Sequence, residues 1–461
     1  MSIEYNRWWV LKNGYIYEET EGISRMITDD FLNFSGTTTE LNLTDLQNST
    51  VEQIIDVIMD QQGSWSIVYF DKKLNKLFIG RDVFGRQSIV FNFELMMFGC
   101  RTKPGTAGNW FEIPFGQVTI LNMNPEEGYQ PVIYSYLNEY PEGVIDTYLS
   151  RWNPTRIVIN KKASLLTVNR EISEATKVLL NKYHSRHVTV CLSGGVDSTF
   201  VAHVVHESTD SDMVIDLVNV AFGNCEKECE QAPDRCRARA ALKSFRIAYP
   251  ERRFRLILVN VDNQSLETHR LESVAPAALP ANSVLDDSLS CVLWFAVRAD
   301  GVDSDTNQPL KSPSKTCILG SGADELLAGY ARHRNRFMKE GKPENIAEEC
   351  ENELRRLGSR NGGRDARVAA QLGKTILSPL LEDTVVTWLN SLSTDSKWDL
   401  SLPRGVGEKL ILRETLKMLG SPYDAPKQAM QFGSRMAKMS NAGNNSIKGS
   451  DKSPHLYKTV T

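Results

Sequence analysis

Short runs of β-branched and aromatic residues alternate with turn formers over the first 135 residues. The runs "WSIVYFD", "KLFIGRD", "QSIVFNF" and "GQVTILN" predict strands at 65–71, 76–82, 87–93 and 116–122. Ahead of them, "STVEQIIDVIMDQQ" carries its apolar residues at helical spacing and predicts a helix. The pattern predicts an α+β domain of stacked antiparallel strands within residues 1–150.

The pattern changes at about residue 163, where predicted strands and helices begin to alternate. Apolar runs predict buried strands at 187–192, 213–222 and 252–261. Helical patterns lie before and between these strands, at 168–184, 198–207 and 234–249. Such alternation is typical of βαβ units in a parallel sheet that is covered on both faces. We therefore expect an α/β domain over residues 163–440, mainly helical towards its end, with residues 136–162 as a linker.

The C-terminal stretch "SNAGNNSIKGSDKSPHLYKTVT" is polar, rich in Gly, Ser and Asn, and almost free of large apolar residues. Such a composition buries too little apolar surface to offset the entropy of ordering the chain. The sequence predicts a disordered tail over residues 441–461.

Composition narrows the class of protein. A chain of 461 residues is longer than a single hydrophobic core usually serves, so two domains are expected. A net charge of -4 gives no basic excess, which argues against nucleic acid as a partner. No apolar run approaches the roughly 20 residues that a membrane span needs. The N-terminus lacks the charged start and apolar centre of a signal peptide, so we expect no membrane association and a cytoplasmic location.

Eight cysteines are scattered along the chain and are expected to be reduced thiols. Cys225, Cys229 and Cys236 lie close enough in sequence to suggest a zinc site as an alternative. Their spacing fits no common zinc finger and no fourth ligand is obvious nearby, so the thiol interpretation is preferred.

The stretch "SGGVDS" lies between a predicted strand and a predicted helix. It consists of Ser193, Gly194, Gly195, Val196, Asp197 and Ser198. Paired glycines let backbone N–H groups turn toward one anion, and the helix N-terminus adds partial positive charge. The lysine of a γ-phosphate-transferring P-loop is missing. An acid at Asp197 beside phosphate requires a divalent cation between them. The pattern favours a nucleotide-phosphate site over a plain glycine turn.

The same stretch resembles the pyrophosphate-binding loop of the ATP pyrophosphatases, which cleave ATP between its α- and β-phosphates. Within that group, residues 163 to about 440 resemble the asparagine synthetase domain. The supporting motifs are "GSGADELLAGYARHR", "SRNGGRDARVAAQLGKTILSPLLED", "LPRGVGEKLILRETLKMLG" and "APKQAMQFGSRMAKM". The first domain resembles the family's class II amidotransferase-like, Ntn-type domain through "GSWSIVYFD" and "GRDVFGRQSIVF". The implied second fold is the parallel-sheet, adenine nucleotide alpha hydrolase-like domain.

The resemblance implies a chemistry and a set of binding residues. In asparagine synthetases, ATP and aspartate form β-aspartyl-adenylate and pyrophosphate, and ammonia then attacks the activated carbonyl. Asp197 and Asp324 would hold magnesium-bound pyrophosphate, so ATP and Mg²⁺ are the implied cofactors. Further positions near the sugar, the α-phosphate or the adenine would be Leu319, Gly320, Val220 and Cys191. For Val220 and Cys191, plain core packing is the alternative.

Two positions of the synthetase site depart from the family pattern. The family loop reads GEGxDE, with a glutamate thought to assist the chemistry, but Ser321 stands at that place. A neutral hydroxyl cannot accept a proton as a carboxylate does. The family's PKxxKEQF motif has a second lysine where this chain has Ala429, while Lys427 is retained. Lys427 is therefore the candidate catalytic cation.

The start of the sequence also departs from the pattern. A class II glutaminase uses a cysteine at residue 2 as nucleophile, whereas this sequence begins Met1-Ser2 and has its first cysteine at Cys100. A serine alkoxide is much harder to generate than a thiolate. The expectation is a degenerate amidotransferase domain without glutaminase activity.

The leading hypothesis is an asparagine-synthetase-like, ATP-binding protein that uses aspartate as its small carboxylate substrate. The rival is a nucleotide-binding pseudoenzyme that acts as a regulatory or assembly partner. A third possibility is adenylation of another substrate, such as a tRNA base. The lack of a basic patch, of an RNA-binding module and of a CxxC pair weighs against it.

Overall fold

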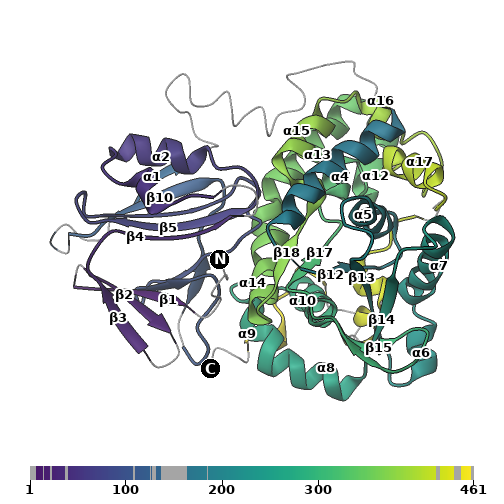
Figure 1. Cartoon of the computed structure of the whole chain (residues 1–461), viewed down its shortest axis with the longest axis horizontal. Coiled ribbons are helices and arrows are strands. Elements are labelled where there is room, and N and C mark those ends of the chain that lie inside the picture. Colours follow the sequence, from purple (N-terminus) through teal and green to yellow (C-terminus); the bar gives the residue numbers. More distant parts are fainter. Residues whose placement is uncertain are drawn as a thin grey trace.

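The computed structural model consists of an N-terminal β-rich unit and a larger C-terminal unit, which lie side by side (Figure 1). The residues that it describes are 7–13, 15–20, 23–36, 40–106, 109–124, 126, 131–135, 164–183, 185–421, 426–440 and 448–457. The expected linker at 136–162 and the expected loss of a nucleophile at Ser2 lie outside the described residues.

The N-terminal unit contains two antiparallel sheets. The first has the order β3 (Ile23–Ile27), β2 (Tyr15–Thr20), β1 (Trp8–Lys12), β8 (Met97–Gly99), β7 (Val90–Asn92) and β9 (Trp110–Glu112). The second has the order β11 (Pro131–Ser135), β10 (Gln117–Asn122), β6 (Lys76–Arg81), β5 (Trp65–Asp71) and β4 (Phe31–Gly36). Its helices are α1 (Leu43–Leu46) and α2 (Val51–Met59). The predicted strand at 87–93 is shorter than expected, because the chain turns back after Asn92 into β8.

Side-chain alternation along β5 explains how these layers stack. Trp65, Ile67 and Tyr69 pack with the helices α1 and α2. The intervening Val68 and Phe70 pack against the first sheet. Because successive residues of a strand point to opposite faces, one strand contributes to two cores. The unit is a helical layer over two stacked sheets (Figure 1).

The C-terminal unit is built on a seven-stranded sheet. Its order is β16 (Pro309–Lys311), β15 (Asp300–Asp303), β14 (Phe254–Val261), β13 (Val214–Phe222), β12 (His187–Cys191), β17 (Thr316–Ile318) and β18 (Thr375–Leu377). The strands from β14 to β18 in this order are parallel, as the alternating pattern predicts. The edge hairpin β15–β16 is antiparallel. The sequence does not predict it, because its two strands are short and their residues are mostly polar and partly exposed.

Helices cover both faces of this sheet. One face carries α4 (Leu165–Asn181), α5 (Val196–Glu207), α7 (Pro233–Ala248), η3 (Pro379–Leu381) and α15 (Asp383–Asn390). The other carries α10 (Val284–Arg298), α14 (Gly363–Gln371) and α19 (Met436–Ser440). The remaining helices are α6 (Glu226–Glu230), α8 (Asn263–His269), η1 (Arg270–Val274), α9 (Ala275–Ala278), α11 (Ala323–Leu326), α12 (Ala331–Glu340), α13 (Pro343–Leu357), η2 (Gly358–Gly362), α16 (Thr394–Lys397), α17 (Leu410–Met418), α18 (Met430–Gly433) and α20 (Pro454–Tyr457). Burial on both faces explains why strands such as β13 read as continuous apolar runs.

The prediction of a disordered tail over 441–461 is wrong for residues 448–457, which pack on the C-terminal unit. The carbonyls of Gly449 and Asp451 accept hydrogen bonds from the N–H groups of Leu285 and Val284, at 2.9 and 2.8 Å. These N–H groups belong to the first turn of α10, where no intrahelical acceptor exists. Leu456 is fully buried against the small residues of α9. The composition of the segment does not reveal these contacts, because they are made by backbone carbonyls and by a single apolar side chain.

Candidate functional site

The candidate site lies where the strand order of the large sheet changes direction. From β12 the chain continues to β13 on one side, and it later returns to β17 on the other side of β12. In open α/β sheets such a switch point forms a crevice at the carboxyl ends of the strands, where ligands bind. The loop after β12 and the loop after β17 meet there: a Cβ on Gly320 would lie 2.8 Å from the Cβ of Asp197.

The loop after β12 forms the expected turn into α5. Gly194 has a φ of +71° and lies against α7, where a Cβ would come within 2.4 Å of the Arg237 backbone. Ser193 Oγ accepts from the N–H of Gly195 at 3.2 Å and lies 3.1 Å from Ser198 Oγ. Gly195 is the N-cap of α5, a twelve-residue helix, so the unpaired N–H groups and the helix dipole point into the crevice.

The loop after β17 turns at Gly322, which has a φ of +97°. A Cβ on Gly322 would lie 2.6 Å from Leu381 Cδ2, so the loop is packed directly on η3. Ser321 is half-buried and lines the crevice. Asp324 lies in the first turn of α11 and is buried.

Two carboxylates, one from each loop, converge on the ammonium group of Lys409. Lys409 Nζ lies 2.7 and 2.6 Å from the two carboxylate oxygens of Asp197, and 2.7 Å from Asp324 Oδ1. Lys427 ion-pairs with the other oxygen of Asp324. Desolvation in the cleft lowers the pKa of Lys427, and the Asp197 carboxylate opposes that shift. We call these four side chains the Lys409 cluster.

The cluster lies in the wall of a cavity of about 630 Å³. A cavity of that size is typical of small-molecule sites. All the sequence-predicted site residues line it except Gly194, which faces α7: Cys191, Ser193, Gly195, Val196, Asp197, Ser198, Val220, Leu319, Gly320, Ser321, Asp324 and Lys427. Ala429 also lines the cavity and brings no charge to it. Gly449 and Ser450 of the tail form another part of the wall.

Cys191 and Val220 border the cavity from the strands β12 and β13. Val220 is buried and packs in the core below α10. Cys191 Sγ lies 3.2 Å from Cys317 Sγ on the neighbouring strand. This contact with Cys317, together with burial, raises the pKa of the Cys191 thiol. A protonated thiol beside valine gives this part of the cavity an apolar surface.

Lys409 was not singled out from the sequence, although it is central to the cluster. It is the N-cap of α17 and takes a left-handed backbone conformation, with a φ of +54°. Its side chain is 1% exposed. An unusual backbone and a buried lysine both depend on the tertiary fold. The sequence offered only the motif "GEKLILRE", in which nothing distinguishes this lysine from a helix-surface one.

A buried acid and a tyrosine lie behind the cluster. The hydroxyl of Tyr330 donates a hydrogen bond to Glu325. Burial raises the pKa of Glu325, and the hydrogen bond from Tyr330 opposes that shift. The Tyr330 ring lies under the Lys427 ammonium, with 5.3 Å from Nζ to the ring centroid, a cation–π distance. Tyr330 therefore contacts both groups, Glu325 through its hydroxyl and Lys427 through its ring.

Within the described residues, no group of three His, Cys, Asp or Glu side chains is arranged to hold a metal by itself. Of the three cysteines of the zinc alternative, Cys225 is exposed, and the other two point to different backbone carbonyls. Cys229 Sγ points to the carbonyl of Ala221 at 3.6 Å, and Cys236 Sγ points to that of Glu230 at 3.4 Å. Asp197 and Asp324 do converge on one cation position, that of Lys409 Nζ, and carboxylate oxygens are the ligands Mg²⁺ prefers. In this structure the Lys409 ammonium occupies the point where the two carboxylates meet.

Among the described helices, none combines the length and the apolar character that crossing a bilayer requires.

Both domains of this chain are similar in sequence to known proteins. Residues 168–395 match the family model described as asparagine synthase, and residues 1–104 match the one described as glutamine amidotransferase domain. Asparagine synthetase domain-containing protein 1 of Mus musculus is 30% identical, over 88% of this chain and 82% of that protein. The proteins of the same name from Bos taurus and Homo sapiens are each 31% identical, over 87% and 88% of this chain and 81% of theirs. Because this identity extends over most of both chains and both family models match, the chain belongs to the asparagine synthetase domain-containing protein 1 family, with an N-terminal glutamine amidotransferase domain and a C-terminal asparagine synthase domain.

Proposed function

We propose that this protein is an asparagine-synthetase-like ATP-binding protein that holds ATP and Mg²⁺ in the 630 Å³ cavity. The observation that carries the proposal is the convergence of the α5 N-terminus, two carboxylates and two lysines at the switch point of the sheet. Helix N-terminal amides and lysine ammonium groups suit phosphate oxygens. Asp197 and Asp324 supply ligands for the divalent cation.

Different residues of the cavity would bind different parts of the nucleotide. The Gly195 end of α5 and the Ser193 hydroxyl would donate hydrogen bonds to phosphate oxygens, and Lys409 and Lys427 would neutralise them. Mg²⁺ would add further charge neutralisation at the leaving pyrophosphate. Val220 and Cys191 give an apolar surface for the base. The substrate implied by family membership is aspartate, activated at its side-chain carboxylate before amide formation.

Turnover is expected to be low. Ser321 offers no acid or base where asparagine synthetases carry glutamate, and Ala429 offers no cation. Binding needs complementary charge and shape, whereas catalysis needs groups that act more strongly on the transition state. These two positions favour the second candidate, a nucleotide-binding pseudoenzyme with a regulatory or assembly role. A pyrophosphate-release assay with ATP–Mg²⁺ and aspartate, with and without ammonia, separates the two candidates.

The binding proposal is tested with Asp197→Asn, which keeps the size of the side chain and removes its charge. We expect the affinity for ATP in Mg²⁺, measured by calorimetry, to fall at least about tenfold, since charged hydrogen-bond partners are worth about 1.5–3 kcal/mol. Glu207→Gln is the matched control, because it removes one charge from the same helix about 15 Å away. Equal ATP affinity in Asp197→Asn and the parent would contradict the proposal.

A further inference from the structure

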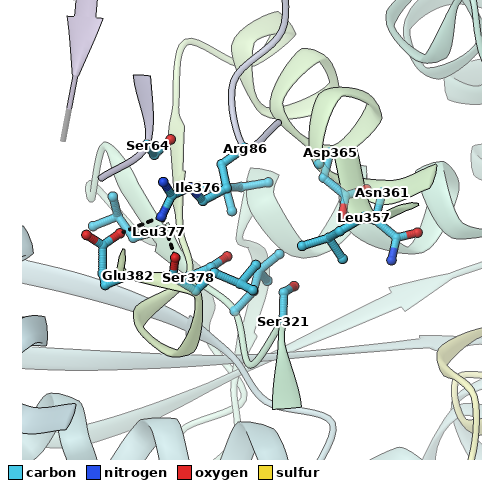
Figure 2. Close-up of a pocket in the computed structure, with 13 residues that line it drawn as sticks. Ser64, Arg86, Ser321, Leu357, Asn361, Asp365, Ile376, Leu377, Ser378 and Glu382 are labelled. Atoms are coloured by element: carbon cyan, nitrogen blue, oxygen red, sulfur yellow. Dashed lines mark hydrogen bonds and ion pairs between the residues drawn. The ribbon is translucent and has the colours of Figure 1, made fainter. Parts of the chain in front are cut away.

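Arg86 of the amidotransferase domain extends into the asparagine synthase domain and is almost completely buried there (Figure 2). Its Nε lies 2.9 Å from Asp82 Oδ1, within its own domain. Its Nη1 donates to the carbonyl of Leu381 and lies 3.6 Å from Glu382 Oε1. Its Nη2 lies 3.3 Å from Asp383 Oδ1. One guanidinium group thus joins the two domains.

The segment that Arg86 holds is the support of the second glycine loop. η3 is a single turn that ends at Leu381. The Leu381 side chain packs on Gly322, which is where the loop after β17 turns. Arg86 and Ser321 also line one cavity, of about 30 Å³. Such a cavity has room for only one or two water molecules, and both the arginine and the loop border it.

Two acids at the start of α15 lie beside this cation. Glu382 is the N-cap of α15 and Asp383 is its first residue, and both are buried. Asp383 Oδ2 also accepts from the N–H of Gly63 in the other domain, at 2.6 Å. Buried carboxylates need compensating charge and hydrogen bonds. The guanidinium of Arg86 lies within ion-pair distance of both acids.

We propose that Arg86 is a positioning residue for the loop 319–325, which makes the amidotransferase domain part of the architecture of the asparagine synthase site. Arg86 fixes Leu381, Leu381 fixes Gly322, and the loop in turn presents Ser321 and Asp324 to the cavity. The role of this loop in holding ATP rests on the proposed function. Its positioning by Arg86 does not.

The test is amide hydrogen exchange in the full chain without ligand. The N–H groups of Leu326 and Leu327 bond to the carbonyls of Gly322 and Ala323, at 2.9 and 3.1 Å, and report the order of the loop. In Arg86→Met we expect them to exchange at least tenfold faster. The N–H of Thr199, bonded to Gly195 in α5, should keep its rate. Arg86→Lys, which keeps the charge with fewer donors, should lie between Arg86→Met and the parent.

Thr102→Val is the matched control. It removes another hydrogen bond between the domains, from Thr102 Oγ1 to the Pro276 carbonyl at 2.8 Å, and does not touch η3. It should leave the Leu326 and Leu327 rates unchanged. Leu381→Ala keeps Arg86 and removes the contact with Gly322, so it should reproduce the local effect even if Arg86→Met does not fold.

The outcomes separate this inference from the proposed function. Unchanged exchange at Leu326 and Leu327 in the folded Arg86 and Leu381 variants would overturn the inference, as would equal acceleration at Thr199. If the parent fails to bind ATP–Mg²⁺, the proposed function fails, while the exchange rates still decide the positioning role. If the parent binds, Arg86→Met should weaken the affinity about tenfold at temperatures where it is folded, and Thr102→Val should not.

Discussion

Two buried cations of this protein, Arg86 and Lys409, each lie among carboxylates, but one group is closed off from solvent and the other faces a cavity. Arg86 lies with Asp82, Glu382 and Asp383 in the closed interface between the domains, and we call this group the Arg86 cluster. The Lys409 cluster opens on the large cavity. Both clusters bring together residues far apart in sequence.

The clusters differ in what else holds their carboxylates. Asp82 accepts hydrogen bonds from backbone N–H groups, including those of Phe84 and Arg86, both at 3.0 Å. In the Lys409 cluster, Asp197 is held by the Lys409 ammonium, and its side chain is 22% exposed. Fixed backbone donors make a cluster rigid, whereas lysine ammonium groups on flexible stems can exchange a carboxylate for a phosphate. The closed cluster suits a structural role and the open one a binding role.

The largest effect on stability is expected for Arg86→Met. Removing one partner of a buried ion pair leaves uncompensated charge and typically costs about 3–5 kcal/mol. Burial alone would lower the pKa of Arg86, yet the three carboxylates raise it, so the cation is strongly held. Urea unfolding should show the loss. Thr102→Val, which removes one neutral hydrogen bond, should cost about 1 kcal/mol. Equal losses in the two variants would mean that the Arg86 cluster stabilises the fold no more than one neutral hydrogen bond between the domains.

Asp234 at the rim of the cavity gives a pH-dependent effect of smaller size. Burial raises its pKa from 3.8 to about 6, although its ion pair with Arg237 opposes the shift. Between pH 3.8 and about 6 the folded state therefore holds more protons than the unfolded state. The stability contributed by this group falls as the pH rises through that window.

Asp234→Asn should remove that dependence. A shift of two pKa units corresponds to about 3 kcal/mol, which is the upper limit of the gain expected at pH 8. At pH 3.5 the gain should vanish, because Asp234 is then largely protonated in both states. Urea unfolding of parent and variant across this range measures the difference. A difference that stays constant with pH would show that Asp234 does not titrate as described.

Lys409→Met tests the open cluster and should affect binding more than stability. Asp324 keeps its ion pair with Lys427, and Asp197 is partly exposed, so the stability loss should be smaller than for Arg86→Met. ATP–Mg²⁺ affinity should fall about 10–100-fold, the equivalent of one charged hydrogen-bond partner. Calorimetry and urea unfolding on the same samples give both quantities. The opposite ranking, a large stability loss with unchanged affinity, would make Lys409 a structural cation like Arg86.

The sequence predicted the loops of the site better than its cations. The glycine loop 193–198 and the motif around Asp324 are local, since strand, turn and helix follow one another along the chain. The parallel sheet then brings them together, because both follow strands that neighbour in it. Lys409 and Arg86 acquire their roles from partners about 200 to 300 residues away, such as Asp197 and Asp383. No local pattern encodes such pairs.

The fold shows the same difference between local sequence patterns, which are predictable, and contacts with distant elements, which are not. The buried elements β5, β13 and α5 are predicted from their runs of apolar, β-branched and aromatic residues. The edge hairpin β15–β16 and the tail segment 448–457 were missed, because backbone hydrogen bonds to other elements hold them rather than an apolar pattern of their own.

Ser321 lies between the two clusters, and its replacement should have the smallest effect. It lines both the large cavity and the small one that it shares with Arg86, Asp365 and Glu382. A glutamate at this position adds a carboxylate near two existing acids, and Ala429 still leaves the site without a second lysine. We therefore expect Ser321→Glu to change pyrophosphate release by less than tenfold.

Ser321→Gln is the matched control for Ser321→Glu, because glutamine has the size of glutamate without its charge. A positioned acid or base typically contributes about 10²–10⁴-fold to a rate. If Ser321→Glu raised aspartate-dependent pyrophosphate release a hundredfold and Ser321→Gln did not, one carboxylate would be all that the site lacks. The cavity would then be a complete synthetase site except for one residue, and the low turnover of the parent would have a single cause. Equal, small effects of both variants would instead mean that low turnover has more than one cause, with the missing cation at Ala429 as the next position to restore.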